Sequence, residues 1–234
     1  FKINIDNYEK GDKIGTGGFG DVFIATEKST GKVFAAKVSH FSRDDERFRR
    51  SEIELLAKAN YPSLVKFIGY SEIDFDHRNY PTIILHLYQN GSLDKFRGEY
   101  TGTFKYIICL GVAISMRHFH SKHIVYRDLK PENILLDEHF YPIISDFGIS
   151  KQSLQDTITI AFKTGIGTVN YMAPEMLDGE EYNLSVDAYA YSMFLYWILT
   201  GEVPYGDEKN LNQISNKICN GIRPDISTIT NEKI

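Results

Sequence analysis

The fold is decided by one stretch, Tyr126-Arg127-Asp128-Leu129-Lys130-Pro131-Glu132-Asn133, with Asp146-Phe147-Gly148 after it. An Asp, a Lys and an Asn fall within six residues, and a second Asp follows the first by 18 positions. Mg²⁺ prefers carboxylate and carbonyl oxygens, which Asn133 and Asp146 carry, and it usually keeps waters and substrate phosphates as well. Asp128 can orient a hydroxyl group and accept its proton, while Lys130 can offset the charge of a phosphoryl group. One such Asp alone would indicate a turn or a cap, but the ordered set predicts a metal–phosphate site.

A second candidate is the glycine-rich stretch Gly15-Thr16-Gly17-Gly18-Phe19-Gly20. Glycine lacks a Cβ, so backbone N–H groups can approach a phosphate there, although the same glycines could simply form a hairpin turn. A dinucleotide-binding fold needs a helix directly after the last glycine. The residues that follow, Val22–Thr26, are strand-like instead, and the Walker pattern of Gly-Lys-Ser/Thr is absent. The pattern therefore predicts a glycine loop between two strands, folded over a nucleotide.

Lys37 is the third candidate, at the end of a predicted strand. A lysine there is most often a solvated surface group, but Lys37 and Ala35 point the same way because strand side chains alternate. If that face lines a crevice, the ammonium needs an anion, either a phosphate or a carboxylate. Glu52 and Glu54 on the next predicted helix are the available carboxylates. We choose Glu52, because its side of the helix also carries Leu56 one turn later.

Hydrophobic periodicity divides the chain into two parts. The first part is strand-like at 8–14, 22–26, 32–38, 64–70 and 82–88, and it includes an amphipathic helix over 42–59. Helices are expected later, over 104–119 and 187–200, the second of them buried on all sides. We therefore expect an α+β fold with a small β-rich N-lobe at 1–86, a hinge at 87–91 and a larger, mainly helical C-lobe at 92–234. A crevice between two such lobes is a common ligand site.

Composition limits the partners. The chain has 234 residues and a formal net charge of −5, which gives no global attraction to nucleic acid or to an anionic membrane. Its most apolar stretch, 188–199, is too short to span a bilayer. Cys109 and Cys219 form no Cys-x-x-Cys pair and are expected to be reduced thiols. No signal peptide opens the chain, which begins at Phe1, so we expect part of a cytoplasmic protein without nucleic-acid partners or membrane contact through these residues.

The ordered motifs resemble the eukaryotic protein kinase family, and the resemblance covers essentially the whole chain. The matching elements, in family order, are Gly15–Gly20, Lys37, Glu52, Tyr126-Arg127-Asp128, Asn133, Asp146-Phe147-Gly148, Ala173-Pro174-Glu175, Asp187 and Gly201-x-x-Pro204-Tyr205. A series of this length in a fixed order is specific. It implies the bilobal protein kinase fold and the use of ATP and Mg²⁺.

The resemblance also implies roles for single residues. Lys37 would hold the α- and β-phosphates and pair with Glu52, and Asp128 would be the catalytic base, with Lys130 beside it. Asn133 and Asp146 would bind magnesium. The nucleotide would further contact Ile14, Gly15, Gly17, Gly20, Val22, Ala35, Leu85, His86, Tyr88 and Leu135. The backbones of His86 and Tyr88 would bind the adenine edge, and Leu85 would be the gatekeeper.

The same resemblance indicates the substrate class. Lys130 and Gly167-Thr168 resemble serine/threonine kinases, and Asn90–Leu93 and Met172 resemble the tyrosine-kinase-like branch, which mostly phosphorylates Ser and Thr. We expect an ATP-dependent kinase of protein Ser and Thr, with dual specificity left open. A pseudokinase acting as a nucleotide-binding scaffold is the rival, although Lys37, Asp128 and Asp146 are all retained. The upstream activator is not indicated by the sequence.

Regulation and departures from the family pattern give further expectations. Arg127 would receive an activation-loop phosphate on Thr157, Thr159 or Thr164. Tyr126 replaces the usual His and would stack with Leu56, Phe67 and Phe147.

The C-terminus supplies another departure. Relatives continue beyond Ile234 and supply there an arginine for the glutamate equivalent to Glu175. We expect Glu175 to lack this partner and the 234-residue fragment to be unstable or poorly active.

Overall fold

The computed structural model describes residues 1–42, 53, 56, 61–96, 102–146, 169–227 and 229. The chain divides into two compact units, Phe1–Tyr88 and Gln89–Ile234. Each unit has its own set of packed elements.

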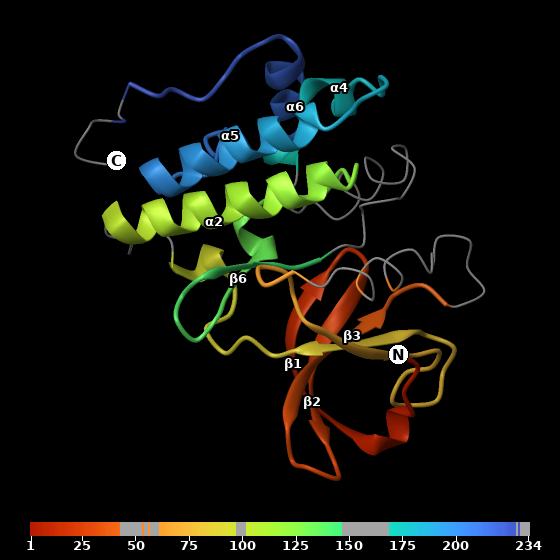
Figure 1. The fold of residues 1–234 in the computed structure, drawn as a ribbon. Helices are drawn as coiled ribbons and strands as arrows, with labels where there is room; N and C mark the ends of the chain where they lie inside the picture. The colour runs from red at the N-terminus through yellow and green to blue at the C-terminus, as the bar shows by residue number, and fades with distance from the viewer. Residues whose placement is uncertain are drawn as a thin grey trace. The chain divides into compact units, whose positions relative to one another are not determined.

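The first unit is built on a five-stranded antiparallel sheet with the strand order β1-β2-β3-β5-β4 (Figure 1). Its strands are β1 (Tyr8–Gly17), β2 (Gly20–Glu27), β3 (Val33–Ser39), β4 (Phe67–Ser71) and β5 (Thr82–His86). All five predicted strands are present. β1 runs past its predicted end because the glycines pair across the hairpin, and β4 begins later than predicted although Leu64 and Val65 before it are buried.

One face of this sheet packs on a small core. Tyr8, Ala25, Ala36 and Ile84 are buried there, together with Ile5 from the short 3₁₀ helix η1 (Ile5–Asn7). The small alanines leave room for the larger side chains of this core to pack closely. Of the helix predicted over 42–59, Ile53 and Leu56 are described, and both are helical and buried, as the amphipathic pattern predicts. The rest of 43–60 lies outside the described residues.

The N-terminal residues cover the edge of β4. Ile3 N–H donates to the Tyr70 carbonyl and Tyr70 N–H donates to the Phe1 carbonyl, each over 2.9 Å. The Phe1 ring lies 5.5 Å from the Phe67 ring. Gly69 is required there, since a Cβ on it would come within 2.5 Å of Ile3 Cγ2. The edge backbone groups of Tyr70 are therefore paired within the chain rather than open to other chains.

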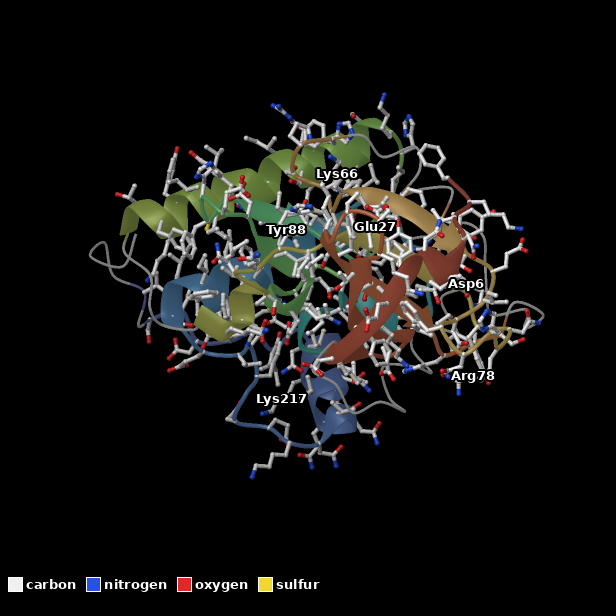
Figure 2. The ribbon with its side chains drawn as sticks, turned by 90° about the horizontal axis from the view of Figure 1, so that it is seen from below. Asp6, Glu27, Lys66, Arg78, Tyr88 and Lys217 are labelled. Carbon is white, nitrogen blue, oxygen red and sulfur yellow. The ribbon has the colours of Figure 1, made fainter. Side chains whose placement is uncertain are left out.

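The loop between β4 and β5 is held by a buried carboxylate. Asp74, 2% exposed, accepts from the Arg78 backbone N–H and from Arg78 Nε, both at 2.9 Å. His77 Nε2 lies 2.9 Å from an oxygen of Asp6, so this loop and η1 meet on one side of the unit, where Figure 2 labels Asp6 and Arg78.

The second unit is mainly helical. Its long helices, α2 (Gly102–Ser121) and α5 (Ser185–Thr200), lie alongside each other (Figure 1), and the Tyr191 hydroxyl of α5 donates to the Cys109 carbonyl of α2 at 3.0 Å. The other elements are η2 (Leu93–Phe96), η3 (Pro131–Asn133), β6 (Ile134–Leu136), β7 (Pro142–Ile144), η4 (Val169–Tyr171), α4 (Pro174–Leu177) and α6 (Leu211–Cys219). The helices predicted over 104–119 and 187–200 are confirmed.

One expectation about α5 is wrong. Val186, Phe194 and Trp197 are buried, but Ala188 and Ser192 are exposed. Ser185 at the start of α5 is exposed as well, so these small residues, three and four positions apart, form a narrow exposed stripe along the helix.

Cys109 and Cys219 are both free thiols, and a cytoplasmic location stays a prediction. Among the described residues, no helix is both long and apolar enough to cross a bilayer.

Candidate active site

The glycine-rich stretch forms the β1–β2 hairpin. Gly15 pairs with Val22, Thr16 with Asp21 and Gly17 with Gly20, so only Gly18 and Phe19 form the turn. The predicted order of strand, glycine loop and strand is therefore confirmed.

The glycines of this hairpin differ in how much room the surrounding chain leaves for a side chain. A Cβ on Gly15 would lie 3.7 Å from Val22 Cβ, and one on Gly17 would lie 3.8 Å from the Gly20 carbonyl, both ordinary contacts. A Cβ on Gly20 would lie only 2.4 Å from the Val38 carbonyl of β3. Packing within the chain thus requires glycine at position 20 but not at 15 or 17. Glycine at the latter two leaves room for a ligand to approach the backbone.

Strand pairing places the predicted nucleotide-contacting residues of the first unit on one face of the sheet. Val22 lies opposite Lys37, and Ala35 lies opposite Leu85. Directly paired residues share a face, and so do residues two apart in a strand. Val22, Ala35, Lys37 and Leu85 therefore share the face opposite the Ala36 and Ile84 core.

Other predicted contacts of this unit lie at its edges. Ile14 is exposed in β1 near an irregularity in the pairing. His86 ends β5, and its ring packs edge-on against Tyr88 at 4.8 Å. Glu52 lies outside the described residues, so its pairing with Lys37 stays a prediction.

In the second unit, the decisive stretch forms a buried polar cluster. Asp128 is 4% exposed, and its Oδ1 lies 3.0 Å from Lys130 Nζ. Asn133 Nδ2 donates to the other carboxylate oxygen of Asp128 at 2.6 Å and to the Asp128 main-chain carbonyl at 2.8 Å. Both amide hydrogens of Asn133 therefore face Asp128, which turns its amide oxygen away from that residue. Three residues that are close in sequence are held in one rigid arrangement.

The second aspartate is brought to this cluster by a short hairpin. β6 follows Asn133 directly and pairs with β7, with Ile134 opposite Ile144. Ser145 N–H and Ser145 Oγ then donate to the Asn133 carbonyl at 2.9 and 3.0 Å, and Asp146 is the next residue. Asp146 has a φ of +52°, a conformation rare outside glycine that holds its side chain in a defined direction.

The pKa values of Asp128 and Lys130 are both shifted by burial and by the charges nearby. Burial raises the pKa of the Asp128 carboxyl, and the charge of Asp146 raises it further, against the opposing effects of Lys130 and Asn133. Burial alone would lower the pKa of Lys130, but the Asp128 carboxylate, together with the charges of Asp146 and Glu132, outweighs it and raises that pKa. Asp128 and Lys130 therefore form an ion pair, and Asp128 accepts a proton more readily than a solvated aspartate.

The backbone before Asp128 is anchored by a fully buried carboxylate. Asp187 is 0% exposed and accepts from Tyr126 N–H at 2.8 Å and from Arg127 N–H at 2.7 Å. His120 Nε2 lies 2.9 Å from the same carboxylate. Arg127 has a φ of +72°, and these bonds hold it there. The sequence reasoning named Asp187 only as a family element and missed His120, because no local pattern links residues from α2, α5 and the intervening loop.

The described contacts of Tyr126 lie within the second unit. It is buried, its ring stacks on Phe119 at 5.6 Å, and its hydroxyl donates to the Ser145 carbonyl. The proposed column with Leu56, Phe67 and Phe147 stays a prediction, since Phe147 is outside the described residues and the other two belong to the first unit.

Several other predicted site residues also belong to the second unit. Leu135 is half-buried in β6, and Arg127 lies with its guanidinium 5.1 Å from the Tyr182 ring. Glu175, expected to lack its arginine partner, is half-buried and accepts from Ser185 Oγ at 3.2 Å. Thr157, Thr159 and Thr164 lie outside the described residues.

Comparison with known proteins agrees with this geometry. Residues 8–233 match the protein kinase domain family, which is nearly the whole chain. The chain belongs to this family.

The chain has similar sequence identities to several individual relatives. The chain is 30% identical to an Aurora kinase of Saccharomyces cerevisiae, over 88% of this chain and 56% of the relative. It is 33% identical to a RAC family serine/threonine-protein kinase homolog of Dictyostelium discoideum, over 87% and 46%. It is 32% identical to the cAMP-dependent protein kinase catalytic subunit 2 of Drosophila melanogaster, over 92% and 61%. The chain thus spans about half the length of these relatives, and their narrow range of identities selects no branch of the family.

Proposed function

We propose that this protein is a serine/threonine kinase that transfers the γ-phosphoryl group of Mg-ATP to a protein hydroxyl. The observation that carries the proposal is the cluster in which Asp128 is held by Lys130 and Asn133, beside Asp146. The family match and the serine/threonine kinases among the relatives support the same reaction.

The residues fit Mg²⁺ and a phosphate chain. The oxygens of Asn133 and Asp146 are hard ligands, and Gly15 and Gly17 leave room for close approach of a phosphate. No cluster of three His, Cys, Asp or Glu side chains that could hold a metal occurs in the described parts of the chain. Mg²⁺ usually keeps several waters and phosphate oxygens as ligands, so two protein ligands such as Asn133 and Asp146 would suffice to hold it with the nucleotide.

The residues of the chain have different roles in the proposed phosphoryl transfer. Mg-ATP, when bound, supplies the phosphoryl group and the cation that neutralises its charge. Asp128 accepts a hydrogen bond from the substrate hydroxyl, orients it and takes up its proton. Lys130 offsets negative charge that develops in the transition state. Lys37 binds phosphate oxygens, and the backbones of His86 and Tyr88 hold the adenine edge.

We also propose, from Asn90–Leu93 and Met172, that the protein belongs to the tyrosine-kinase-like branch and prefers Ser and Thr. The segment Asn90–Leu93 has a defined conformation, since Gly91 has a φ of +71° and its carbonyl accepts from Leu136 N–H at 3.0 Å. Labelled peptides that differ only in Ser, Thr or Tyr at the acceptor position test this preference. Equal transfer to Tyr would indicate dual specificity.

The central experiment is a radiolabelled ATP assay on a generic protein substrate. We expect Asp128→Asn to lower transfer about 10²- to 10⁴-fold, the usual contribution of a positioned acid–base group. Asp146→Asn and Lys37→Met should also abolish most transfer, and Glu138→Gln, an exposed acid of the same unit, should not. Transfer by Asp128→Asn at the wild-type rate would refute the assignment. Nucleotide binding without transfer by the wild type would indicate a scaffold instead.

A further inference from the structure

A charged cluster lies behind the glycine hairpin, on the sheet face opposite Val22 and Lys37. Asp21, one residue after the last glycine, has its Oδ1 2.7 Å from Lys13 Nζ and 3.2 Å from His40 Nε2. These three residues come from β1, β2 and the segment that follows β3. One carboxylate therefore connects β1, β2 and the segment after β3 next to the turn.

Charge favours this arrangement. The hydrogen bond from Lys13 is the largest cause that lowers the pKa of Asp21; partial burial opposes it, and His40 and Thr16 lower it further. Asp21 is thus ionised at neutral pH. Thr16 belongs to the glycine-rich stretch itself and lies directly opposite Asp21 in the hairpin.

The backbone makes a parallel connection. His40 N–H donates to the carbonyl of Phe19, in the turn, at 3.0 Å. The residue before it, Ser39, pairs with Gly20, and its hydroxyl bonds both the N–H and the carbonyl of Phe41 at 3.0 and 2.9 Å. The hydrogen bonds between Ser39 and Phe41 therefore fix the conformation of the segment that carries His40, and the His40 N–H connects this segment to the turn.

We propose that Asp21 is a positioning residue for ATP, which, with Lys13 and His40, holds the glycine turn against the end of β3 before the nucleotide binds. The inference rests on the proposed function, in which the turn binds phosphate. Glycine-rich turns lose much conformational freedom when they are ordered. A turn that is already held loses less on binding, so affinity rises without any direct contact between Asp21 and the ligand.

Two variants test the inference with a matched control. Asp21→Asn removes the carboxylate charge, and His40→Gln removes the imidazole ring but keeps a side-chain hydrogen-bond donor at position 40. Glu72→Gln is the control, because the side chain of Glu72 is 27% exposed like that of Asp21 and forms an ion pair with Lys2 at 2.9 Å, away from the hairpin. Binding of a fluorescent ATP analogue gives the dissociation constant, and steady-state assays give kcat and KM for ATP.

We expect Asp21→Asn to weaken nucleotide binding and raise KM about three- to tenfold, as for the loss of one partly exposed ion pair and one further polar contact, with kcat within about twofold of wild type. His40→Gln should have a smaller effect and Glu72→Gln none. The affinity gap between wild type and Asp21→Asn should shrink in 1 M NaCl, because salt screens exposed charges. Equal affinities, or an equal loss in Glu72→Gln, would overturn the inference.

Amide hydrogen exchange over residues 14–22, without nucleotide, separates this inference from the proposed function. Asp21→Asn should exchange faster there, while Glu72→Gln should match wild type. Unchanged exchange in Asp21→Asn would refute the positioning role, even if the protein is a kinase. A wild type that binds no nucleotide would refute the proposed function, and the exchange result would still decide whether Asp21 holds the turn. If Asp21→Asn does not fold, His40→Gln serves in both measurements.

Discussion

Gly17 and Gly20 lie opposite each other in one hairpin, yet their replacement by alanine should have opposite consequences. In Gly20→Ala the new Cβ would lie 2.4 Å from the Val38 carbonyl, closer than the 3.0 Å below which real Cβ contacts essentially never occur. The backbone of β2 or β3 must therefore move by about 0.6 Å, and overpacking of this kind costs about 1–3 kcal/mol. In a chain of this length each kcal/mol lowers the melting temperature by about 2–4 °C, so we expect a loss of about 2–12 °C.

Gly17→Ala should leave the fold almost unchanged. Its Cβ would lie 3.8 Å from the Gly20 carbonyl, an ordinary contact, and alanine loses less entropy on folding than glycine. We expect its free energy of unfolding to stay within about 0.5 kcal/mol of wild type. Its affinity for ATP should fall about tenfold or more, because a methyl group then occupies space that a phosphate would use.

The assay combines thermal denaturation with nucleotide binding for both variants and the wild type. Each variant is the control for the other, because both add one methyl group to the same hairpin. The reasoning is refuted if Gly20→Ala melts with the wild type while Gly17→Ala melts lower. Unchanged nucleotide affinity in Gly17→Ala would show that this glycine does not serve phosphate approach.

Three further predictions concern the second unit. Asp187→Asn places amide hydrogens where a carboxylate accepts backbone N–H groups, so urea titration should show about 2–4 kcal/mol less stability, against less than about 1 kcal/mol for His120→Gln; equal losses would contradict this. Burial raises the pKa of Cys109 to about 11, so its alkylation rate, followed by mass spectrometry, should still rise about tenfold from pH 8.5 to 9.5, where a free cysteine levels off. Gly111→Ala should lower the melting temperature despite the better helix propensity of alanine, because its Cβ would lie 2.5 Å from Pro142 Cγ; a higher melting temperature would show that the ring moves freely.

Sequence reasoning succeeded where a feature is local. Strands β1, β2 and β3 follow from alternating side chains between glycine turns, and the hairpin over Gly15–Gly20 follows from the strand-like residues after it. The cluster of Asp128, Lys130 and Asn133 was predictable because these residues lie within one short segment.

Other features depend on packing between distant segments. The exposed stripe of Ala188 and Ser192 was not predicted, since apolar content alone does not tell which side of a helix is covered. The hydroxyl partner of Glu175 was missed for a similar reason, because Ser185 lies on a different helix.

The order and spacing of the catalytic motifs are properties of the chain, and with them come the family, the elements that carry each motif and the chemistry proposed for Asp128. Only the folded arrangement distinguishes Gly20 from Gly17, connects Asp21 to His40, and places the Asp187 carboxylate on Tyr126 N–H, 61 residues away. The physical reason is the separation along the chain over which each kind of interaction acts. Backbone preference and side-chain alternation act over a few residues, whereas a buried carboxylate finds its hydrogen-bond donors only after distant helices and loops have packed together.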